Sequence, residues 1–266
     1  MSFLKNKRIW ITGASSGIGE ALAYACAQQE AHLILSSRNE QELNRVAAAA
    51  AKSGAASVLV QVLDLAAHAS IPNIVATVLG KVGKIDVLMN NGGISQRSLA
   101  KDTSLEVDQR IMAINYFGTV ALTKAVLPTM LTHQLGHIVT ITSLTGKFGS
   151  PYRSSYAASK HALHGFFDSL RAELHDAHIK VTLVCPGFVR TNVSINALTG
   201  SGTSLGTMDE ATDKGMAPER LARKILSAIE SGKEEVYFGG KEVLGVYVKR
   251  LFPSYFSKII SKAKVR

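Results

Sequence analysis

The chain has 266 residues, of which 46% are hydrophobic and 19% charged, and its net charge is +10. This length suits one large α/β domain with a single core, and the composition excludes a low-complexity or repeat protein. Because charges or glycines interrupt the longest apolar segments and the first motif begins near residue 12, we expect neither a membrane span nor a signal peptide.

Short apolar runs alternate with alanine-rich amphipathic runs along the chain. The apolar runs are continuous, which indicates burial on both faces, and the alternation predicts an α/β fold with a doubly wound parallel sheet and helices on both faces. In such a sheet the ligand lies beyond the carboxyl ends of the strands, so residues just after each strand are the first candidates. We expect strands at Arg8–Thr12, His32–Ser36, Ser57–Gln61, Ile85–Met89, His137–Thr142, Ile179–Val184 and Glu235–Phe238, and helices at Glu20–Gln28, Glu40–Lys52, Ser70–Gly80, Leu105–Leu131, Tyr156–Asp176 and Pro218–Ser231.

A glycine-rich turn that contains Gly13, Gly17 and Gly19 joins the first strand to the first helix. Glycine lets the backbone approach a phosphate closely, and the free N–H groups of a helix start face such an anion. The turn therefore indicates dinucleotide binding, although its spacing differs from G-x-G-x-x-G and a plain tight turn would look the same.

The ends of the second and third strands carry the next candidates. An acid after the second strand would bind the ribose hydroxyls of NAD, but this chain has Ser37 and Arg38, and a guanidinium can pair with a 2′-phosphate. We therefore expect NADP(H), the alternative being that Arg38 only caps the loop at the surface. Asp64 is placed to accept a hydrogen bond from an adenine amino group or to cap a helix, and both can hold together.

The fourth and fifth strands are followed by Asn90-Asn91-Gly92-Gly93 and by Ser143. The first run permits close approach of a ligand, although a plain turn would look the same. Beyond Ser143, Tyr156 and Lys160 lie one helical turn apart, which places a phenol beside an ammonium. A nearby cation lowers the pKa of a tyrosine, and a shift of about 3 units needs roughly 4 kcal/mol, which the lysine and an oxidised nicotinamide ring together can supply.

Two segments depart from the strand–helix pattern. The run from Thr191 to Gly215 is rich in Gly, Thr and Ser, and we interpret it as a mobile lid at about 191–216, the alternative being an insertion without a role. From Lys241 to Arg266 there are seven basic residues and one acidic residue, interleaved with aromatic side chains. This segment is either a surface that contacts anionic lipid or an acylated substrate, or a solvated helix whose apolar face packs on its own domain or on a partner subunit. We expect one catalytic domain over residues 1–240 and a basic aromatic C-terminal segment over 241–266.

The cysteines and histidines give no metal site. Cys26 and Cys185 could form one disulfide, but a reduced cytoplasmic protein is the simpler interpretation. His161 and His164 are one helical turn apart, yet neither has a carboxylate or cysteine at ligand spacing, so we interpret them as structural or solvated.

Taken together, the motifs resemble those of the compact, single-domain short-chain dehydrogenases/reductases, from about Lys7 to Phe238. The resemblance implies a Rossmann-type sheet of about seven strands in the order 3-2-1-4-5-6-7. One departure is Gly92, where the family usually has alanine, and the missing methyl should loosen the turn without abolishing cofactor binding. The matching elements, in order, are Thr12 to Gly19, Asp64, Asn90 to Gly93, Asn115, Ser143, Tyr156 with Lys160, and Pro186-Gly187 followed by Thr191.

The resemblance also implies roles for individual residues. Tyr156 would be the general acid/base, Lys160 would hold the nicotinamide ribose and lower the tyrosine pKa, and Ser143 would hydrogen-bond the substrate oxygen. Asn115 would anchor a water beside Lys160, whereas the residues alone suggest only a polar side chain tolerated in a helix. The residues implied to bind the cofactor are Gly13, Ser15, Ser16, Gly17, Ile18, Gly19, Ser37, Arg38, Asp64, Leu65, Asn91, Gly92, Tyr156, Lys160, Pro186, Gly187, Val189 and Thr191.

These expectations predict an NADP(H)-dependent oxidoreductase that interconverts a carbonyl and a secondary alcohol. We expect an apolar small-molecule substrate, such as a steroid, retinoid, long-chain acyl or aryl ketone. Alternatives are a peripheral-membrane reductase of lipid-like substrates and a non-catalytic NADP-binding sensor. We expect no nucleic-acid partner, because the basic excess is concentrated in the tail without a recognition motif. We expect the protein to be cytoplasmic or membrane-associated. The resemblance implies a homodimer or homotetramer that pairs through the helices near Leu105 and Tyr156. The candidate lining residues are Leu144, Phe148, Tyr152, Phe188 and Leu198.

Overall fold

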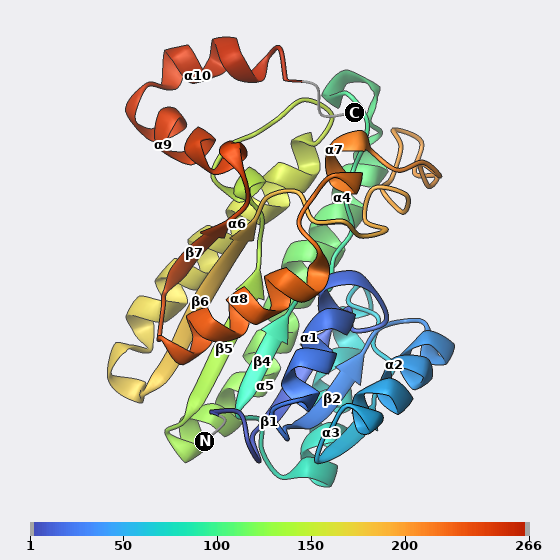
Figure 1. Cartoon of the computed structure of the whole chain (residues 1–266), viewed down its shortest axis with the longest axis vertical. Coiled ribbons are helices and arrows are strands. Elements are labelled where there is room, and N and C mark those ends of the chain that lie inside the picture. Colours follow the sequence, from blue (N-terminus) through green and yellow to red (C-terminus); the bar gives the residue numbers. More distant parts are fainter. Residues whose placement is uncertain (1–2, 264–266) are drawn as a thin grey trace.

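A parallel sheet forms the centre of the molecule (Figure 1). The computed structural model describes residues 3–263, and over this range seven strands pair in the order β3-β2-β1-β4-β5-β6-β7, each parallel to its neighbours. The predicted fold and strand order are confirmed. The order reverses between β1 and β4, which is where such a sheet opens a crevice for a ligand. The strands are β1 (Arg8–Thr12), β2 (His32–Ser36), β3 (Ser57–Val60), β4 (Val87–Asn90), β5 (Gly136–Ile141), β6 (Ile179–Pro186) and β7 (Glu235–Phe238).

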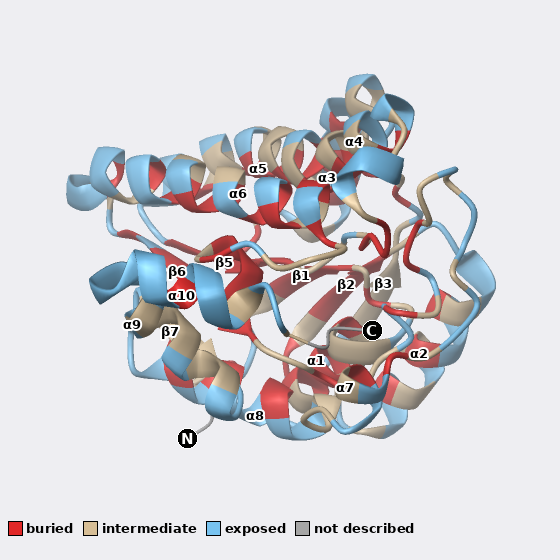
Figure 2. Cartoon of the chain, turned by 90° about the horizontal axis from the view of Figure 1, so that it is seen from above, coloured by how far each residue is buried: buried red, intermediate tan, exposed pale blue. Residues whose placement is uncertain are grey.

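Helices cover both faces of the sheet (Figure 2). One face carries α1 (Gly17–Ala27), α2 (Glu40–Lys52) and α8 (Pro218–Glu230), and the other carries α3 (Ile71–Val82), α5 (Thr119–His133) and α6 (Ser154–Glu173). Successive side chains of β1 enter the two cores in turn: Ile9 and Ile11 pack with the first set of helices and Trp10 with the second. All six residues of β5 are buried, which agrees with the two-sided burial expected from its continuous apolar run.

The helix expected over Leu105–Leu131 is interrupted. It consists of α4 (Leu105–Met112), a π-helical turn over Ala113–Gly118, and α5. A π turn is uncommon inside a helix and frequently lies at a functional site, and this one carries the fully buried Asn115. Among residues 3–263, the combined helix Leu105–His133 has the length and composition of a membrane span. Here it covers the sheet, with Leu122 and Val126 buried, as a core helix does.

The two segments that depart from the repeating pattern both lie beyond the carboxyl ends of the strands (Figure 1). Residues 191–216 are irregular apart from the short α7 (Glu210–Asp213). The chain after β7 forms two short helices rather than one, α9 (Leu244–Leu251) and α10 (Pro253–Ile260). Phe256 of α10 is buried against Phe148, with 5.1 Å between the ring centroids, so α10 is docked on the domain through its apolar side.

Candidate functional site

A cavity of about 900 Å³ runs along the carboxyl ends of the strands. Most of the residues predicted from the sequence line it, although they come from α6 and from the separate segments that follow β1 to β6. Two predicted residues, Gly19 and Asn115, lie behind its wall rather than on it. The predicted residues that line the cavity are Gly13, Ser15, Ser16, Gly17, Ile18, Ser37, Arg38, Asp64, Leu65, Asn91, Gly92, Ser143, Tyr156, Lys160, Pro186, Gly187, Val189 and Thr191.

The glycine-rich turn has a backbone that only glycine adopts easily. Gly13 and Gly17 have φ values of +64° and +59°. A Cβ on Gly19 would lie 2.2 Å from the carbonyl oxygen of Gly13, so this glycine allows α1 to pack tightly against the turn. The first turn of α1 has no side-chain cap from Ser16, which leaves its N–H groups directed at the cavity. This arrangement fits the pyrophosphate of a dinucleotide.

The turn after β4 is locked to the turn after β1. Thr12 Oγ1 accepts hydrogen bonds from the backbone N–H groups of Asn91 (3.0 Å) and Gly92 (2.9 Å), and Asn91 Nδ2 donates to Thr12 O at 3.0 Å. A Cβ on Gly92 would lie 2.8 Å from Leu65 Cδ1. An alanine methyl at residue 92, the residue usual in the family, would therefore require the flexible end of the Leu65 side chain to shift.

The loop after β2 leaves one cation on the cavity rim. Asn39 caps α2 by accepting a hydrogen bond from the Glu42 N–H at 3.1 Å, so Arg38 is not the cap of this helix. Arg38 is exposed and lines the cavity beside Ser37. Asp64 also lines the cavity, and its Oδ1 accepts from the Ala66 N–H at 2.9 Å. The next helical turn begins at His68 with Ala67 as its N-cap, so Asp64 is not a helix cap, and its contact with adenine stays a prediction.

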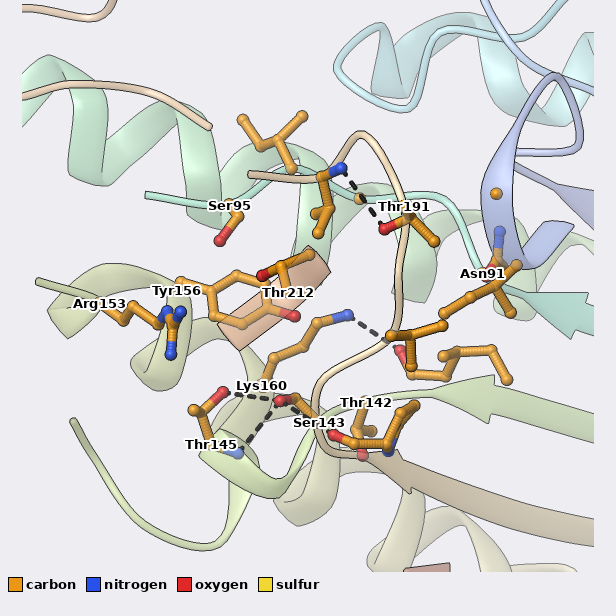
Figure 3. Close-up of a pocket in the computed structure, with 18 of the residues that line it drawn as sticks. Asn91, Ser95, Thr142, Ser143, Thr145, Arg153, Tyr156, Lys160, Thr191 and Thr212 are labelled. Atoms are coloured by element: carbon orange, nitrogen blue, oxygen red, sulfur yellow. Dashed lines mark hydrogen bonds between the residues drawn. The ribbon is translucent and has the colours of Figure 1, made fainter. Parts of the chain in front are cut away.

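Ser143, Tyr156 and Lys160 converge on one wall of the cavity (Figure 3). Lys160 Nζ lies 5.7 Å from the centroid of the Tyr156 ring and donates to Ile141 O at 2.9 Å. Ser143 Oγ accepts from the backbone N–H (3.1 Å) and the hydroxyl (2.9 Å) of Thr145, which hold its oxygen in place. The phenol, hydroxyl and ammonium are thus brought together from α6 and the loop after β5.

Burial and neighbouring positive charges act in opposite directions on the pKa of Tyr156. Desolvation lowers the pKa of Lys160 to about 8. Burial raises the pKa of Tyr156 above its usual range, and this is opposed by the positive charge of Arg153, a hydrogen bond with Ser143 and the positive charge of Arg97. Burial prevails, and the opposing charges come from two arginines that the sequence analysis did not select.

Asn115 supports the site from behind. Its amide accepts from the Ile94 N–H (2.8 Å) and donates to Ile94 O (2.9 Å) and to Ser159 Oγ (3.0 Å). These bonds join the π turn, the loop after β4 and α6. The side chain is therefore committed to protein groups, and the expected water relay beside Lys160 stays a prediction.

A family model described as "short chain dehydrogenase" matches residues 7–201. The chain belongs to the short-chain dehydrogenase/reductase family. It is 45% identical to "Dehydrogenase/reductase SDR family protein 7-like" of Drosophila melanogaster, over 99% of this chain and 82% of the relative. It is 41% identical to "Dehydrogenase/reductase SDR family member 7B" of Bos taurus, over 98% and 82%.

Solved structures show the same fold. A short-chain dehydrogenase/reductase from Burkholderia phymatum in complex with NAD aligns with a TM-score of 0.86 at 22% identity, over 96% of both chains. An alcohol dehydrogenase from Thermococcus sibiricus complexed with 5-hydroxy-NADP aligns with a TM-score of 0.76 at 26% identity, over 89% of this chain and 97% of that one. Members of this fold thus bind either nucleotide, and the chain has the fold of an NAD(P)-dependent oxidoreductase.

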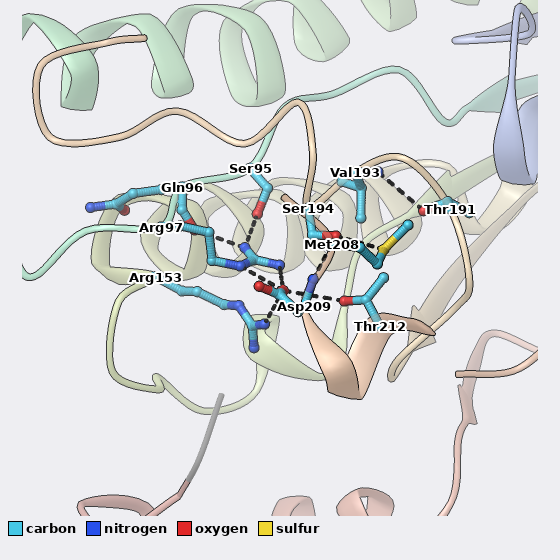
Figure 4. Close-up of polar contacts among 10 residues, drawn as sticks. All are labelled: Ser95, Gln96, Arg97, Arg153, Thr191, Val193, Ser194, Met208, Asp209 and Thr212. Atoms are coloured by element: carbon cyan, nitrogen blue, oxygen red, sulfur yellow. Dashed lines mark hydrogen bonds and ion pairs between the residues drawn. The ribbon is translucent and has the colours of Figure 1, made fainter. Parts of the chain in front are cut away.

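In this short-chain dehydrogenase/reductase, sequence reasoning missed a buried ion cluster of Arg97, Arg153 and Asp209 (Figure 4). Both arginines line the cavity, as Tyr156 does. Arg97 donates to Asp209 Oδ2 from Nε (2.8 Å) and Nη2 (2.6 Å), and Arg153 Nη2 lies 3.4 Å from the same oxygen. All three side chains are at most 7% exposed. The available signal was weak: Arg153 lies three residues before Tyr156, but Asp209 is 112 positions from Arg97 and only the fold joins them.

The far end of the cavity is apolar. Of the five lining candidates from the sequence, all but Tyr152 line the cavity. The C-terminal helices α9 and α10 also line the cavity. The sequence analysis suggested contact of this segment with an acylated substrate but did not place it in the cavity wall. The lining residues of these helices are Leu244, Gly245, Val248, Phe256, Ile259 and Ile260.

Over residues 3–263, no three His, Cys, Asp or Glu side chains gather as a metal would require. His164 nevertheless has a cysteine and a carboxylate nearby in the fold, both from residues distant in sequence. Its Nε2 lies 3.6 Å from Cys185 Sγ and its Nδ1 3.4 Å from Glu235 Oε2. Burial raises the pKa of Cys185 to about 12, which disfavours the thiolate form, and Cys26 is likewise free and buried.

Proposed function

We propose that the protein is an NADP(H)-dependent oxidoreductase that interconverts a carbonyl and a secondary alcohol on an apolar small molecule, with Tyr156 as general acid/base. The observation that carries this proposal is the convergence of Ser143, Tyr156 and Lys160 on one wall of a cavity whose other end is the glycine-rich turn. Family membership supports the reaction type.

The side chains account for the chemistry at the substrate oxygen. The nicotinamide, when bound, supplies or accepts the hydride. Ser143 and Tyr156 donate hydrogen bonds to the carbonyl oxygen, where negative charge grows in the transition state, and Tyr156 then transfers its proton to that oxygen. Lys160 has a pKa of about 8, so its ammonium form predominates at pH 7 and favours the phenolate that remains.

Arg38 supports a preference for NADP(H). Its guanidinium is exposed on the cavity rim, and Asn39 rather than Arg38 caps the adjacent helix. A phosphate on the ribose can form charge-assisted hydrogen bonds with this side chain and Ser37.

The direct test measures NADPH consumption with a panel of aryl, alicyclic and long-chain ketones and aldehydes. General acid catalysis accounts for about 10²- to 10⁴-fold in rate, so Tyr156→Phe should lose that much in kcat while still binding NADPH. Tyr24→Phe is the matched control: its hydroxyl bonds Glu20 at 2.6 Å on α1, and it does not line the cavity. Undiminished turnover by Tyr156→Phe would refute the mechanism.

A second candidate function is favoured by the surface of α9 and α10. Leu251, Phe252 and Tyr255 are each more than 60% exposed, and Lys249, Arg250 and Lys258 lie on the same two helices. Apolar and basic side chains together suit the surface of an anionic membrane. Since these helices also line the cavity, we infer that a lipid-like substrate enters from such a surface.

Vesicle sedimentation tests this candidate with the whole chain. Binding should be stronger to phosphatidylcholine vesicles that contain phosphatidylserine than to phosphatidylcholine alone, and Lys249→Glu/Arg250→Glu should abolish the difference. Arg220→Glu/Arg223→Glu, a change of equal charge on exposed positions of α8, is the control. Equal sedimentation of both variants would remove the basis of this candidate.

Homo-oligomerisation is part of the proposal. Leu105 and Phe117, on the helix through which we expect two copies to pair, are 64% and 53% exposed. Burying them against a second copy would remove this apolar surface from water. Light scattering of the purified protein measures the oligomer directly.

A further inference from the structure

The chain that leaves β7 holds an acidic side chain against the domain. Glu242 is the one acidic residue of segment 241–266, and it lies two positions before α9 begins at Leu244. Its side chain is half-buried and lines the cavity, whereas Lys249 and Arg250 on α9 are exposed. Glu242 therefore faces the domain, unlike the basic residues that follow it in the same segment.

Three glycines make room for the Glu242 carboxylate. A Cβ on Gly187 would overlap Oε1, and a Cβ on Gly239 would lie 2.8 Å from the same oxygen. A Cβ on Gly240 would lie 3.0 Å from Oε2. Because Gly187 follows β6 and the other two glycines follow β7, the carboxylate lies between the ends of two paired strands. A side chain at Gly187 or Gly239 would displace it.

The carboxylate contacts the loop that the resemblance implies for the nicotinamide. Glu242 Oε1 accepts a hydrogen bond from the Phe188 N–H at 3.4 Å. The Gly187 N–H donates to the last residue of β7 at 2.7 Å, and Ser143 Oγ donates to Pro186 O at 3.4 Å. Three successive residues of the loop are thus held by three different parts of the chain, and Glu242 supplies the contact from the C-terminal segment.

On its other side Glu242 adjoins the apolar wall of the cavity. Leu244, Gly245 and Val248 of α9 line the cavity, and a Cβ on Gly245 would lie 3.2 Å from the Phe148 ring. Figure 1 shows α9 following on β7, so Glu242 lies in the short connection between them. The carboxylate therefore lies where the loop after β6 meets the start of the substrate wall.

We propose that Glu242 is a positioning residue that holds loop 186–189 ready for the nicotinamide and joins this loop to the start of α9. The inference rests on the proposed function, because it assumes that the loop contacts the cofactor. A loop that is already ordered costs less free energy to bind, so Glu242 contributes to nucleotide affinity rather than to the chemical step. Since NADPH and NADH share the nicotinamide, the contribution is the same for both.

Isothermal titration of NADPH and of NADH tests this role. Glu242→Ala should weaken the binding of both nucleotides by about 3- to 10-fold, as expected for the loss of one hydrogen bond. Glu242→Gln keeps an acceptor oxygen at the same distance from the backbone and should bind within about twofold of the parent. Glu242→Asp keeps the charge but is one methylene shorter, so it should lose as much as Glu242→Ala. Glu230→Ala, at an exposed position of α8, is the control.

Gly239→Ala tests the same contact without changing Glu242. The new methyl would displace the carboxylate, so nucleotide binding should weaken about as much as in Glu242→Ala. The double variant Gly239→Ala/Glu242→Ala should lose no more than Glu242→Ala alone, because both changes remove one interaction. Additive losses in the double variant would overturn the assignment of this glycine to the carboxylate.

Amide hydrogen exchange of the protein without nucleotide reports the order of the two segments directly. Segments 186–190 and 241–248 should exchange faster together in Glu242→Ala and Glu242→Asp, and at the parent rate in Glu242→Gln. With saturating NADPH, kcat for the ketone that is reduced fastest should stay within about twofold of the parent in all three variants, since the bound nucleotide restores the order of the loop.

Unchanged affinity and exchange in Glu242→Ala would overturn the inference. Retained binding in Glu242→Asp with weakened binding in Glu242→Gln would also overturn it, because charge rather than the hydrogen bond would then be responsible. A fall in kcat at unchanged affinity would place Glu242 in the chemical step instead. If Tyr156→Phe is fully active or NADH binds more tightly than NADPH, the proposed function fails, while hydrogen exchange of the free protein still decides the role of Glu242.

Discussion

The two ends of the cavity differ in how they are built. The cofactor end consists of short loops that directly follow β1 to β4, and each loop contributes residues that are adjacent in sequence, such as Gly13 to Ile18 or Asn91-Gly92. The substrate end combines Arg97, Arg153, segment 191–216 and α9–α10. A local motif can be recognised from spacing, whereas a wall assembled from distant segments cannot, and the following variants separate the two ends experimentally.

The largest effect is expected at the packing glycine of the cofactor end. In Gly19→Ala the new methyl would lie 2.2 Å from a backbone oxygen, so α1 must shift away from the turn. NADPH affinity should fall by up to about 150-fold, since overpacking of this kind costs about 1–3 kcal/mol. Isothermal titration measures the affinity.

Gly80→Ala is the matched control, because a Cβ on this exposed glycine of α3 meets nothing within 4 Å. It should raise the free energy of unfolding by about 0.5–1 kcal/mol, with NADPH affinity unchanged. Unaltered NADPH binding in Gly19→Ala would contradict the close packing of turn and helix.

The next effect concerns nucleotide choice. Arg38→Leu removes the exposed cation beside Ser37. A charge-assisted hydrogen bond is worth about 1.5–3 kcal/mol, so the preference for NADPH over NADH should fall by about 10- to 100-fold. Dissociation constants of both nucleotides, measured by quenching of Trp10 or by nucleotide fluorescence, give the ratio. If the ratio of the two dissociation constants does not change, Arg38 does not contact the 2′-phosphate and is only a surface residue.

A smaller effect, confined to the substrate end, is expected from Phe256→Ala. Phe256 packs on Phe148 within a cluster that includes Leu144 and anchors α10, so its loss should loosen the C-terminal helices. The KM for apolar ketones should rise by about tenfold, corresponding to about 1.4 kcal/mol, while the NADPH dissociation constant stays within about twofold. A parallel loss of both affinities would show that the two ends are not independent.

The smallest effect tests the packing between Leu65 and Gly92. Gly92→Ala places a methyl 2.8 Å from Leu65 Cδ1, a flexible side-chain end that can give way. NADPH affinity should fall by a few-fold, about 1 kcal/mol, and the double variant Gly92→Ala/Leu65→Ala should recover it. Additive losses in the double variant would exclude Leu65 as the reason for glycine at this position.

Local patterns predicted most of the fold, because buried parallel strands and amphipathic helices have distinct periodicities. The strand over Glu235–Phe238 and the helix over Glu40–Lys52 begin and end where they were expected. The π turn at Asn115 was not foreseen, since it depends on hydrogen bonds from Asn115 to Ile94 and Ser159, which are distant in sequence. The position of α9 and α10 over the cavity likewise depends on a distant contact, the packing of Phe256 on Phe148.

Residue spacing by itself determined the strand–helix alternation, the glycine-rich turn, and the Tyr156–Lys160 pair one helical turn apart, because each of these is set by the period of one element and its nearest neighbours. The tertiary structure alone decided that two arginines meet a distant aspartate, that Leu65 lies where a methyl on residue 92 would point, and that the C-terminal helices line the cavity. Contacts of this kind depend on which surfaces meet when the chain folds, and no local pattern encodes that geometry.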